Sequence, residues 1–229
     1  MNRPESSPTI RALKKIPRRK DYLLALSDGT EIRVTEDDVS GFSLAVGGEL
    51  PQAERTELES RHEYARSMDS ALRLLKVRPR TEGEIRRSLR TRGMVGATAD
   101  RVIQTLKASG QIDDRIFARL WATEKFRGGS TGRRRVIAEL RAKMVDPEVA
   151  EEETAAVYVL ESEVDLARDL ARKRASRMAG LSADSRKRRL YGHLLRRGFE
   201  PEIAAQAVQS ALRSQDGIES QEDIGRAGD

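Results

Sequence analysis

The sequence contains no cysteine, which excludes disulfide bonds, thiolate nucleophiles and thiolate metal ligands together. Aromatic residues make up only 4% of the 229 residues, and no apolar run approaches the roughly 18 residues that span a bilayer. The first ten residues carry no hydrophobic segment of the kind found in a secretory signal. We therefore expect a protein of the reducing cytoplasm that is not inserted in a membrane.

Residue patterns typical of catalysis are also missing. The two histidines, His62 and His193, lie far apart without a serine or carboxylate constellation, so neither a catalytic triad nor a zinc site is predicted. The glycine-rich run 128–132 lacks the lysine of a phosphate-binding loop. The adjacent Asp113 and Asp114 are explained as a helix cap. We predict no enzyme activity, no catalytic or metal site and no cofactor.

Charged residues, in contrast, are abundant. They make up 35% of the chain against 38% hydrophobic residues, a mixture that favours thin helical layers over a thick sandwich or barrel. Residues 61–213 contain 33 Lys and Arg against 21 Asp and Glu, a net charge of +12, whereas residues 214–229 carry −4. Such a basic region favours a polyanionic partner, nucleic acid among them.

The N-terminal part predicts a small β unit. Two strands, 21–27 and 30–35, flank Asp28-Gly29, a pair that readily adopts the positive φ angles of a tight hairpin. A short strand at 9–14 is a candidate partner. We assign residues 1–50 to an N-terminal β extension with a short helix and residues 51–67 to a connecting helix.

From residue 52 onward the apolar spacing is helical, and helix boundaries are marked clearly. Pro79 ends one helix, and Thr81 with Glu84 forms a capping box that starts the next. Asp146 followed by Pro147 is an N-cap with proline at the first helical position.

An internal repeat becomes visible when the helical region is aligned with itself. The matching anchors are Ile85, Leu89 and Gly93, then Val136, Leu140 and Met144, then Leu190, Leu194 and Gly198. They define three three-helix repeats, 68–114, 115–164 and 165–213, followed by an acidic tail, 214–229, that we predict to be disordered. Because each repeat is too small to bury its own apolar faces, neighbours must stack. The predicted fold is mainly α: an elongated, curved array of three tandem three-helix repeats with a small N-terminal β-hairpin extension.

Basic residues gather at equivalent helix starts in two of the three repeats. Arg133–Arg135 corresponds to Lys187–Arg189 in the third repeat but to Glu82–Glu84 in the first. Cations at a helix N-terminus oppose the helix dipole by about 0.3–1 kcal/mol each, so we interpret both triplets as contacts to phosphate or to an acidic protein surface. Basic residues near the ends of the same helices complete the set. The candidate contact residues are Arg133, Arg134, Arg135, Arg141, Lys143, Lys187, Arg188, Arg189, Arg196 and Arg197.

Several segments form one combined pattern. They are Ala71–Leu75, Arg78–Ile85, Leu89–Gly93, Gly110–Asp114, Phe117-Ala118, Gly132 and Ile137–Leu140. Together they resemble the signature of the RecX regulators of the RecA recombinase, and the N-terminal hairpin resembles the β extension of many members. The sequence departs from the family pattern at Gly83, where a bulkier residue is usual, and at Met144, where glycine is usual.

The resemblance implies a cytoplasmic modulator, mainly an inhibitor, of RecA in DNA repair by homologous recombination and in the SOS response. It implies binding in the groove of the RecA filament on DNA, restraining filament growth, ATP hydrolysis and strand exchange. The implied partners are RecA and DNA, the latter directly or through RecA, and we expect a monomer.

Two alternatives remain open. Helix pairs such as 82–92 and 99–109 could act like a helix-turn-helix in a direct DNA-binding regulator. A metal-dependent nuclease would require a carboxylate cluster that the sequence pattern does not indicate.

Overall fold

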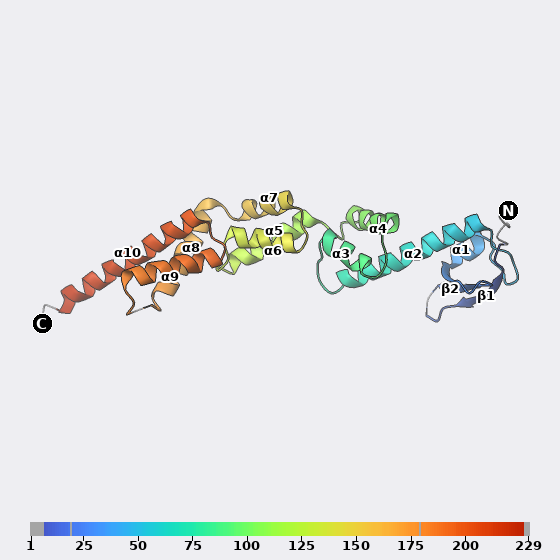
Figure 1. The fold of residues 1–229 in the computed structure, drawn as a ribbon, viewed down its shortest axis with the longest axis horizontal. Helices are drawn as coiled ribbons and strands as arrows, with labels where there is room; N and C mark the ends of the chain where they lie inside the picture. The colour runs from blue at the N-terminus through green and yellow to red at the C-terminus, as the bar shows by residue number, and fades with distance from the viewer. Residues whose placement is uncertain (1–6, 19, 179, 227–229) are drawn as a thin grey trace, which may run out of the picture. The chain divides into compact units, whose positions relative to one another are not determined.

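A computed structural model describes residues 7–18, 20–178 and 180–226 of the protein (Figure 1). The chain divides into two compact units, one comprising residues 1–78 and 85–111 and the other residues 79–84 and 112–229. None of the helices within the described residues is both long and apolar enough to cross a membrane.

The first unit begins with a three-stranded antiparallel sheet. Strands β1 (Ile10–Lys15), β2 (Asp21–Leu26) and β3 (Glu31–Thr35) lie in the order β1-β2-β3, which confirms the predicted hairpin and its additional strand. At the turn between β2 and β3, Gly29 has a φ of 89°, a conformation that glycine adopts without steric cost. Helix α1 (Glu36–Gly41) follows directly and begins with a capping box between Thr35 and Asp38.

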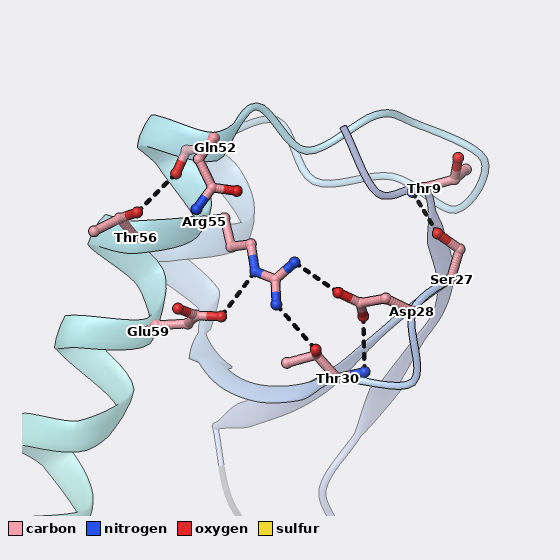
Figure 2. A network of polar contacts seen from close by, with 8 residues as sticks. All are labelled: Thr9, Ser27, Asp28, Thr30, Gln52, Arg55, Thr56 and Glu59. Carbon is pink, nitrogen blue, oxygen red and sulfur yellow. Dashed lines mark hydrogen bonds and ion pairs between the residues drawn. The ribbon is translucent and has the colours of Figure 1, made fainter. Parts of the chain in front are cut away.

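The connecting helix α2 (Gln52–Leu75) packs against this sheet. Figure 2 shows how Arg55, near the start of α2, holds the hairpin turn: its guanidinium donates to Asp28 Oδ2 at 2.6 Å, to Thr30 Oγ1 at 3.1 Å and to Glu59 Oε1 at 2.8 Å. The apolar core of this N-terminal part consists of side chains from the strands, from the loop between α1 and α2, and from α2. Its fully buried members include Leu24, Leu26, Ile32, Val34, Leu50 and Leu58.

The C-terminal part of α2 and the remaining eight helices form three three-helix repeats, which confirms the mainly α fold with a small N-terminal sheet. The eight helices are α3 (Glu82–Arg90), α4 (Ala97–Ala108), α5 (Asp114–Arg127), α6 (Arg133–Ala142), α7 (Pro147–Val157), α8 (Leu160–Ala175), α9 (Ala183–Arg196) and α10 (Pro201–Arg226). Helix α10 extends through most of the segment 214–229 that we predicted to be disordered, and residues 227–229 lie outside the described residues.

The predicted helix caps are present. Thr81 Oγ1 accepts the N–H of Glu84 at 3.1 Å, and Asp146 Oδ1 accepts the N–H of Glu148 at 2.9 Å. The apolar repeat anchors lie in the core. Ile85, Leu89, Val136, Leu140, Leu190 and Leu194 are all 0% exposed.

Two junctions between repeats lie within the second unit and use equivalent contacts. Thr81 Oγ1 donates to the carbonyl of Lys143 at 2.6 Å, and at the next junction the N–H of Gly132 donates to the carbonyl of Arg197 at 2.8 Å. In both cases the start of one repeat's second helix rests on the end of the next repeat's second helix. At both junctions a backbone carbonyl of the later repeat therefore accepts a hydrogen bond from the start of the earlier repeat's second helix.

One position further along, each helix start receives a carboxylate from the first helix of the following repeat. These helices, α5 and α8, begin at Asp114 and Leu160, slightly before the predicted repeat boundaries at 115 and 165. The N–H of Glu82 donates to Asp114 Oδ1, and the N–H of Arg133 donates to Glu163 Oε1, both at 2.8 Å. The first N–H groups of a helix have no partner within the helix, so these carboxylates satisfy them from outside.

The two residues that depart from the family pattern meet at the first junction. A Cβ added to Gly83 would lie 2.4 Å from the Cβ of Met144, so glycine is needed for this approach. Met144 has a φ of 63°, a conformation in which glycine is usual. At the second junction the glycine is on the other side, because a Cβ added to Gly198 would lie 2.4 Å from the Cβ of Arg135. The glycine therefore exchanges sides between the two junctions, and each close approach keeps one residue without a Cβ.

We expect Gly83→Ala to lower the free energy of unfolding by about 1–3 kcal/mol, because the added methyl group overlaps Met144. In a Met144→Gly background the same substitution should cost at least about 1 kcal/mol less, since the Cβ contact is gone. Urea unfolding of the four proteins in this double-mutant cycle measures the difference. Strictly additive effects would contradict the proposed exchange.

Candidate functional site

Two equivalent grooves are lined by four of the six predicted contact residues at the starts of α6 and α9. The second-repeat groove, about 860 Å³, lies between α6 and α7 and is also bordered by Glu200. The third-repeat groove, about 790 Å³, lies between α9 and α10, which run side by side in Figure 1. Six lining positions correspond between the two grooves. They pair Arg133 with Lys187, Arg134 with Arg188, Ile137 with Tyr191, Glu151 with Ala205, Glu152 with Gln206 and Ala155 with Gln209.

In the second-repeat groove the cations face carboxylates of the same chain. Arg141 Nη2 lies 2.5 Å from Glu151 Oε1, and the guanidinium groups of Arg133 and Arg134 each lie 3.8 Å from Glu200. The three cations and the three carboxylates that line this groove, including Glu152, balance each other.

The remaining cations on α6 also have partners in the chain. Arg135 Nε lies 3.3 Å from Glu139 Oε1, and its Nη1 donates to the carbonyl of Arg196 at 3.4 Å. The ammonium group of Lys143 lies 4.3 Å from the ring centroid of Trp121, in a cation–π contact. The second-repeat candidates therefore take part in the packing of their own repeat and its junction.

Glu139 and Glu163 are two partly or fully buried carboxylates whose pKa values shift in opposite directions. Burial alone would raise the pKa of Glu139, but hydrogen bonds from Lys125 and Arg135 lower it below its ordinary value. Burial raises the pKa of Glu163, which is 2% exposed, although the N–H and charge of Arg133 act against this rise. The pKa of Glu139 is therefore lowered by its partners, while that of Glu163 is raised by burial.

The third-repeat cations are arranged differently. Lys187, Arg188, Arg189 and Arg196 are exposed, and Arg197 is half-buried. Among the described residues, none of these five forms a salt bridge. Burial, followed by the positive charges of Arg174, Arg197 and Arg196, lowers the pKa of His193. Positive charge is therefore concentrated around the end of α9.

The structure brings some predicted residues together and separates others. Arg133–Arg135 meet Arg196 and the neighbouring Glu200 at the junction between the second and third repeats, whereas Lys187–Arg189 lie near the opposite end of α9. Sequence reasoning missed Glu163 and Glu200, the carboxylates that meet Arg133. Glu200 belongs to the Glu-Pro-Glu segment that matches Asp146-Pro-Glu148. This pattern indicates a helix start, but it does not indicate an ion pair.

Within the described part of the chain, no group of three or more His, Asp or Glu side chains is placed to hold a metal ion. The chemistry that this surface offers is charge complementarity and hydrogen bonding.

Comparison with known proteins agrees with the three repeats. Family models described as the first, second and third three-helix domains of RecX match residues 68–106, 113–152 and 161–208. The regulatory protein RecX of Amycolatopsis mediterranei is 34% identical over 157 residues, which cover 69% of this chain and 89% of that protein. The regulatory protein RecX of Lactococcus lactis is 29% identical over 206 residues, covering 88% and 76%.

Solved structures show the same fold. A crystal structure of regulatory protein RecX aligns with a TM-score of 0.67 at 20% identity, covering 86% of this chain and 96% of that chain. The crystal structure of RecX from Lactobacillus salivarius aligns with a TM-score of 0.61 at 22% identity, covering 65% and 96%.

The buried Glu163 predicts a pH dependence of stability. Its pKa in the folded protein lies above its ordinary value of 4.5, so its contribution to stability is complete below that value and is lost as the pH rises through the folded pKa. Glu163→Gln keeps a hydrogen-bond acceptor but does not titrate. We expect this variant to gain stability relative to the parent protein as the pH is raised from about 4.5 to 7.

Urea unfolding of the parent protein and the variant across this pH range measures the effect. Glu163→Ala serves as the control, because it removes the acceptor for the Arg133 N–H and should cost about 1–3 kcal/mol. A pH-independent difference between the parent protein and Glu163→Gln would rule out the titration.

Proposed function

This chain belongs to the RecX family, and on that basis we propose that it modulates the RecA recombinase, mainly as an inhibitor. In this proposal it binds in the groove of the RecA–DNA filament and restrains filament growth, ATP hydrolysis and strand exchange. It acts in the cytoplasm as a monomer, without a cofactor. RecA supplies the ATPase, and DNA is contacted directly or through RecA.

The observation that carries this proposal is the set of exposed third-repeat cations without carboxylate partners among the described residues. A protein gains nothing in its own folding from like charges held together. An anionic partner surface would compensate them. Several cations lie on the third repeat, so contacts that are individually weak can reinforce each other on one partner surface.

We assign the ten candidate residues to two roles. Lys187, Arg188, Arg189, Arg196 and Arg197 are the principal contacts to the filament. Arg133, Arg134, Arg135, Arg141 and Lys143 mainly stabilise the second repeat and its junction, because each has a partner within the chain. Their remaining exposed area can still contribute long-range attraction.

A direct DNA-binding regulator of the helix-turn-helix type has less support. In the second repeat, the third helix α7 carries the exposed carboxylates Glu148, Glu151 and Glu152. A helix with this charge would be repelled from the major groove by the flanking phosphates. Sequence-specific binding of duplex DNA by the protein alone would favour this alternative.

The test is an ATP hydrolysis assay with RecA, single-stranded DNA and the purified protein. We expect the parent protein to slow hydrolysis, and the variant with Lys187, Arg188 and Arg189 replaced by glutamate to require about tenfold more protein for the same effect. Its free energy of unfolding should change by no more than about 0.5 kcal/mol, because these side chains are exposed.

The matched control replaces Arg133, Arg134 and Arg135 by glutamate, an equal change of charge. This control should lose stability, because the new carboxylates face Glu200 and Glu139. Binding of each protein to DNA without RecA separates DNA contact from RecA contact. Unchanged inhibition by the 187–189 variant would remove these residues from the site.

A further inference from the structure

The two equivalent grooves differ in the charge that lines them. In the second-repeat groove, three arginines are balanced by Glu151, Glu152 and Glu200. In the third-repeat groove, the positions of Glu151 and Glu152 hold Ala205 and Gln206. Its charged lining consists of Lys187, Arg188 and Arg213 against Asp184, a net charge of +2 among the described lining residues. Among the described lining residues, the net charge is therefore zero in the second-repeat groove and positive in the third-repeat groove.

The floor of the third-repeat groove is apolar. Tyr191 of α9 and Leu212 of α10 are half-buried, and Val208 lies between the two helices at 2% exposure. An apolar floor beside cations suits a polypeptide, which presents carboxylates and apolar side chains together. A phosphate backbone would use the cations but would leave this floor without a partner.

The start of α9 excludes a further repeat, such as one from a second copy of this chain, as the occupant. Helix α6 begins at Arg133, after Gly132 has come close to the next repeat, and a Cβ on Gly132 would lie 2.4 Å from the N atom of Phe199. In the third repeat the equivalent of Gly132 is Arg186, and α9 already begins at Ala183 with Ser182 as its own N-cap. Helix α9 thus starts one turn earlier than α3 and α6, and the turn 183–186 with the Arg186 side chain stands where the following repeat meets Thr81 or Gly132 at the two junctions.

We propose that the third-repeat groove binds a partner polypeptide segment that carries carboxylates beside apolar side chains. The carboxylates of this segment take the places of Glu151, Glu152 and Glu200 of the second repeat, facing Lys187 and Arg188. Its apolar side chains cover Tyr191 and Leu212. The inference rests on the proposed function and deepens it, because it makes an acidic polypeptide surface, not DNA phosphate, the ligand of this groove.

The probe is a short fluorescein-labelled peptide of glutamate and leucine, titrated with the full-length protein and followed by fluorescence anisotropy. We expect saturable binding that weakens when glutamine replaces the glutamates of the peptide. The decisive variant is Ala205→Glu with Gln206→Glu, which gives the third-repeat groove the carboxylates of the second. Both positions are exposed, so the fold is kept, and affinity for the peptide should fall about tenfold or more.

A second variant, Lys187→Glu with Arg188→Glu, should lose affinity to at least the same extent. The controls change the charge equally outside the groove, on α8 and the turn that follows it. Lys173→Glu matches the first variant, and Lys173→Glu with Arg177→Glu matches the second. We expect these controls to keep their affinity within about twofold, because separated surface charges are screened by salt.

Three outcomes would overturn the inference: no binding of the peptide, unchanged affinity in the Ala205→Glu, Gln206→Glu variant, or equal weakening in the controls. Labelled oligothymidylate, titrated in parallel, tests nucleic acid as the occupant. Binding of oligothymidylate that is lost on charge reversal at Lys187 and Arg188, with no peptide binding, would assign the groove to DNA instead.

The RecA hydrolysis assay keeps this inference distinguishable from the proposed function. A parent protein that binds the peptide but leaves RecA unaffected would contradict the proposed function and support the groove. A parent protein that inhibits RecA but does not bind the peptide would overturn the groove alone.

Discussion

The N–H groups at the start of a helix need hydrogen-bond partners, and in this protein the second helix of a repeat finds part of them in the repeat that follows. Asp114 accepts the N–H of Glu82, and Glu163 accepts that of Arg133. Because a carboxylate must lie within hydrogen-bond distance of one particular N–H, these contacts fix the register between repeats, which apolar packing alone would define less sharply. The position of Glu200 beside Arg133 and Arg134, and hence the neutral lining of the second-repeat groove, follows from this register.

Much of the fold could be predicted because its signals act within a few residues. The Asp28-Gly29 turn, the capping box of Thr81 and Glu84, and the Asp146-Pro147 start all depend on contacts between near neighbours in the chain. The repeat was visible because the same apolar positions must be buried in every copy. In contrast, the meeting of Gly83 with Met144 joins residues from different repeats. Each looked like an isolated exception in the sequence, and only the packing shows that they compensate each other.

The candidate site was predictable as a set of charges but not as a set of partners. Arg133–Arg135 and Lys187–Arg189 occupy equivalent positions, and the sequence offered no reason to treat them differently. The difference arises from residues elsewhere: Glu200 comes from the following repeat, while Ala205 and Gln206 replace two carboxylates on the adjacent helix. Whether a cation is neutralised thus depends on helix packing, which joins positions tens of residues apart.

Divergence between repeats also explains how one architecture can serve stability and recognition at once. A groove whose cations are paired within the chain stabilises its junction but offers little net charge to a partner. A groove that keeps the cations and loses the carboxylates weakens its own repeat through repulsion, and it gains the capacity to bind an anionic surface. Because natural sequences otherwise keep local interactions mutually favourable, a repeat that retains such repulsion is the place where function is expected. The third repeat meets this criterion. Among the described residues, Lys187, Arg188, Arg189, Arg196 and Arg197 form no salt bridge, and the groove has an apolar floor on which a polypeptide can pack.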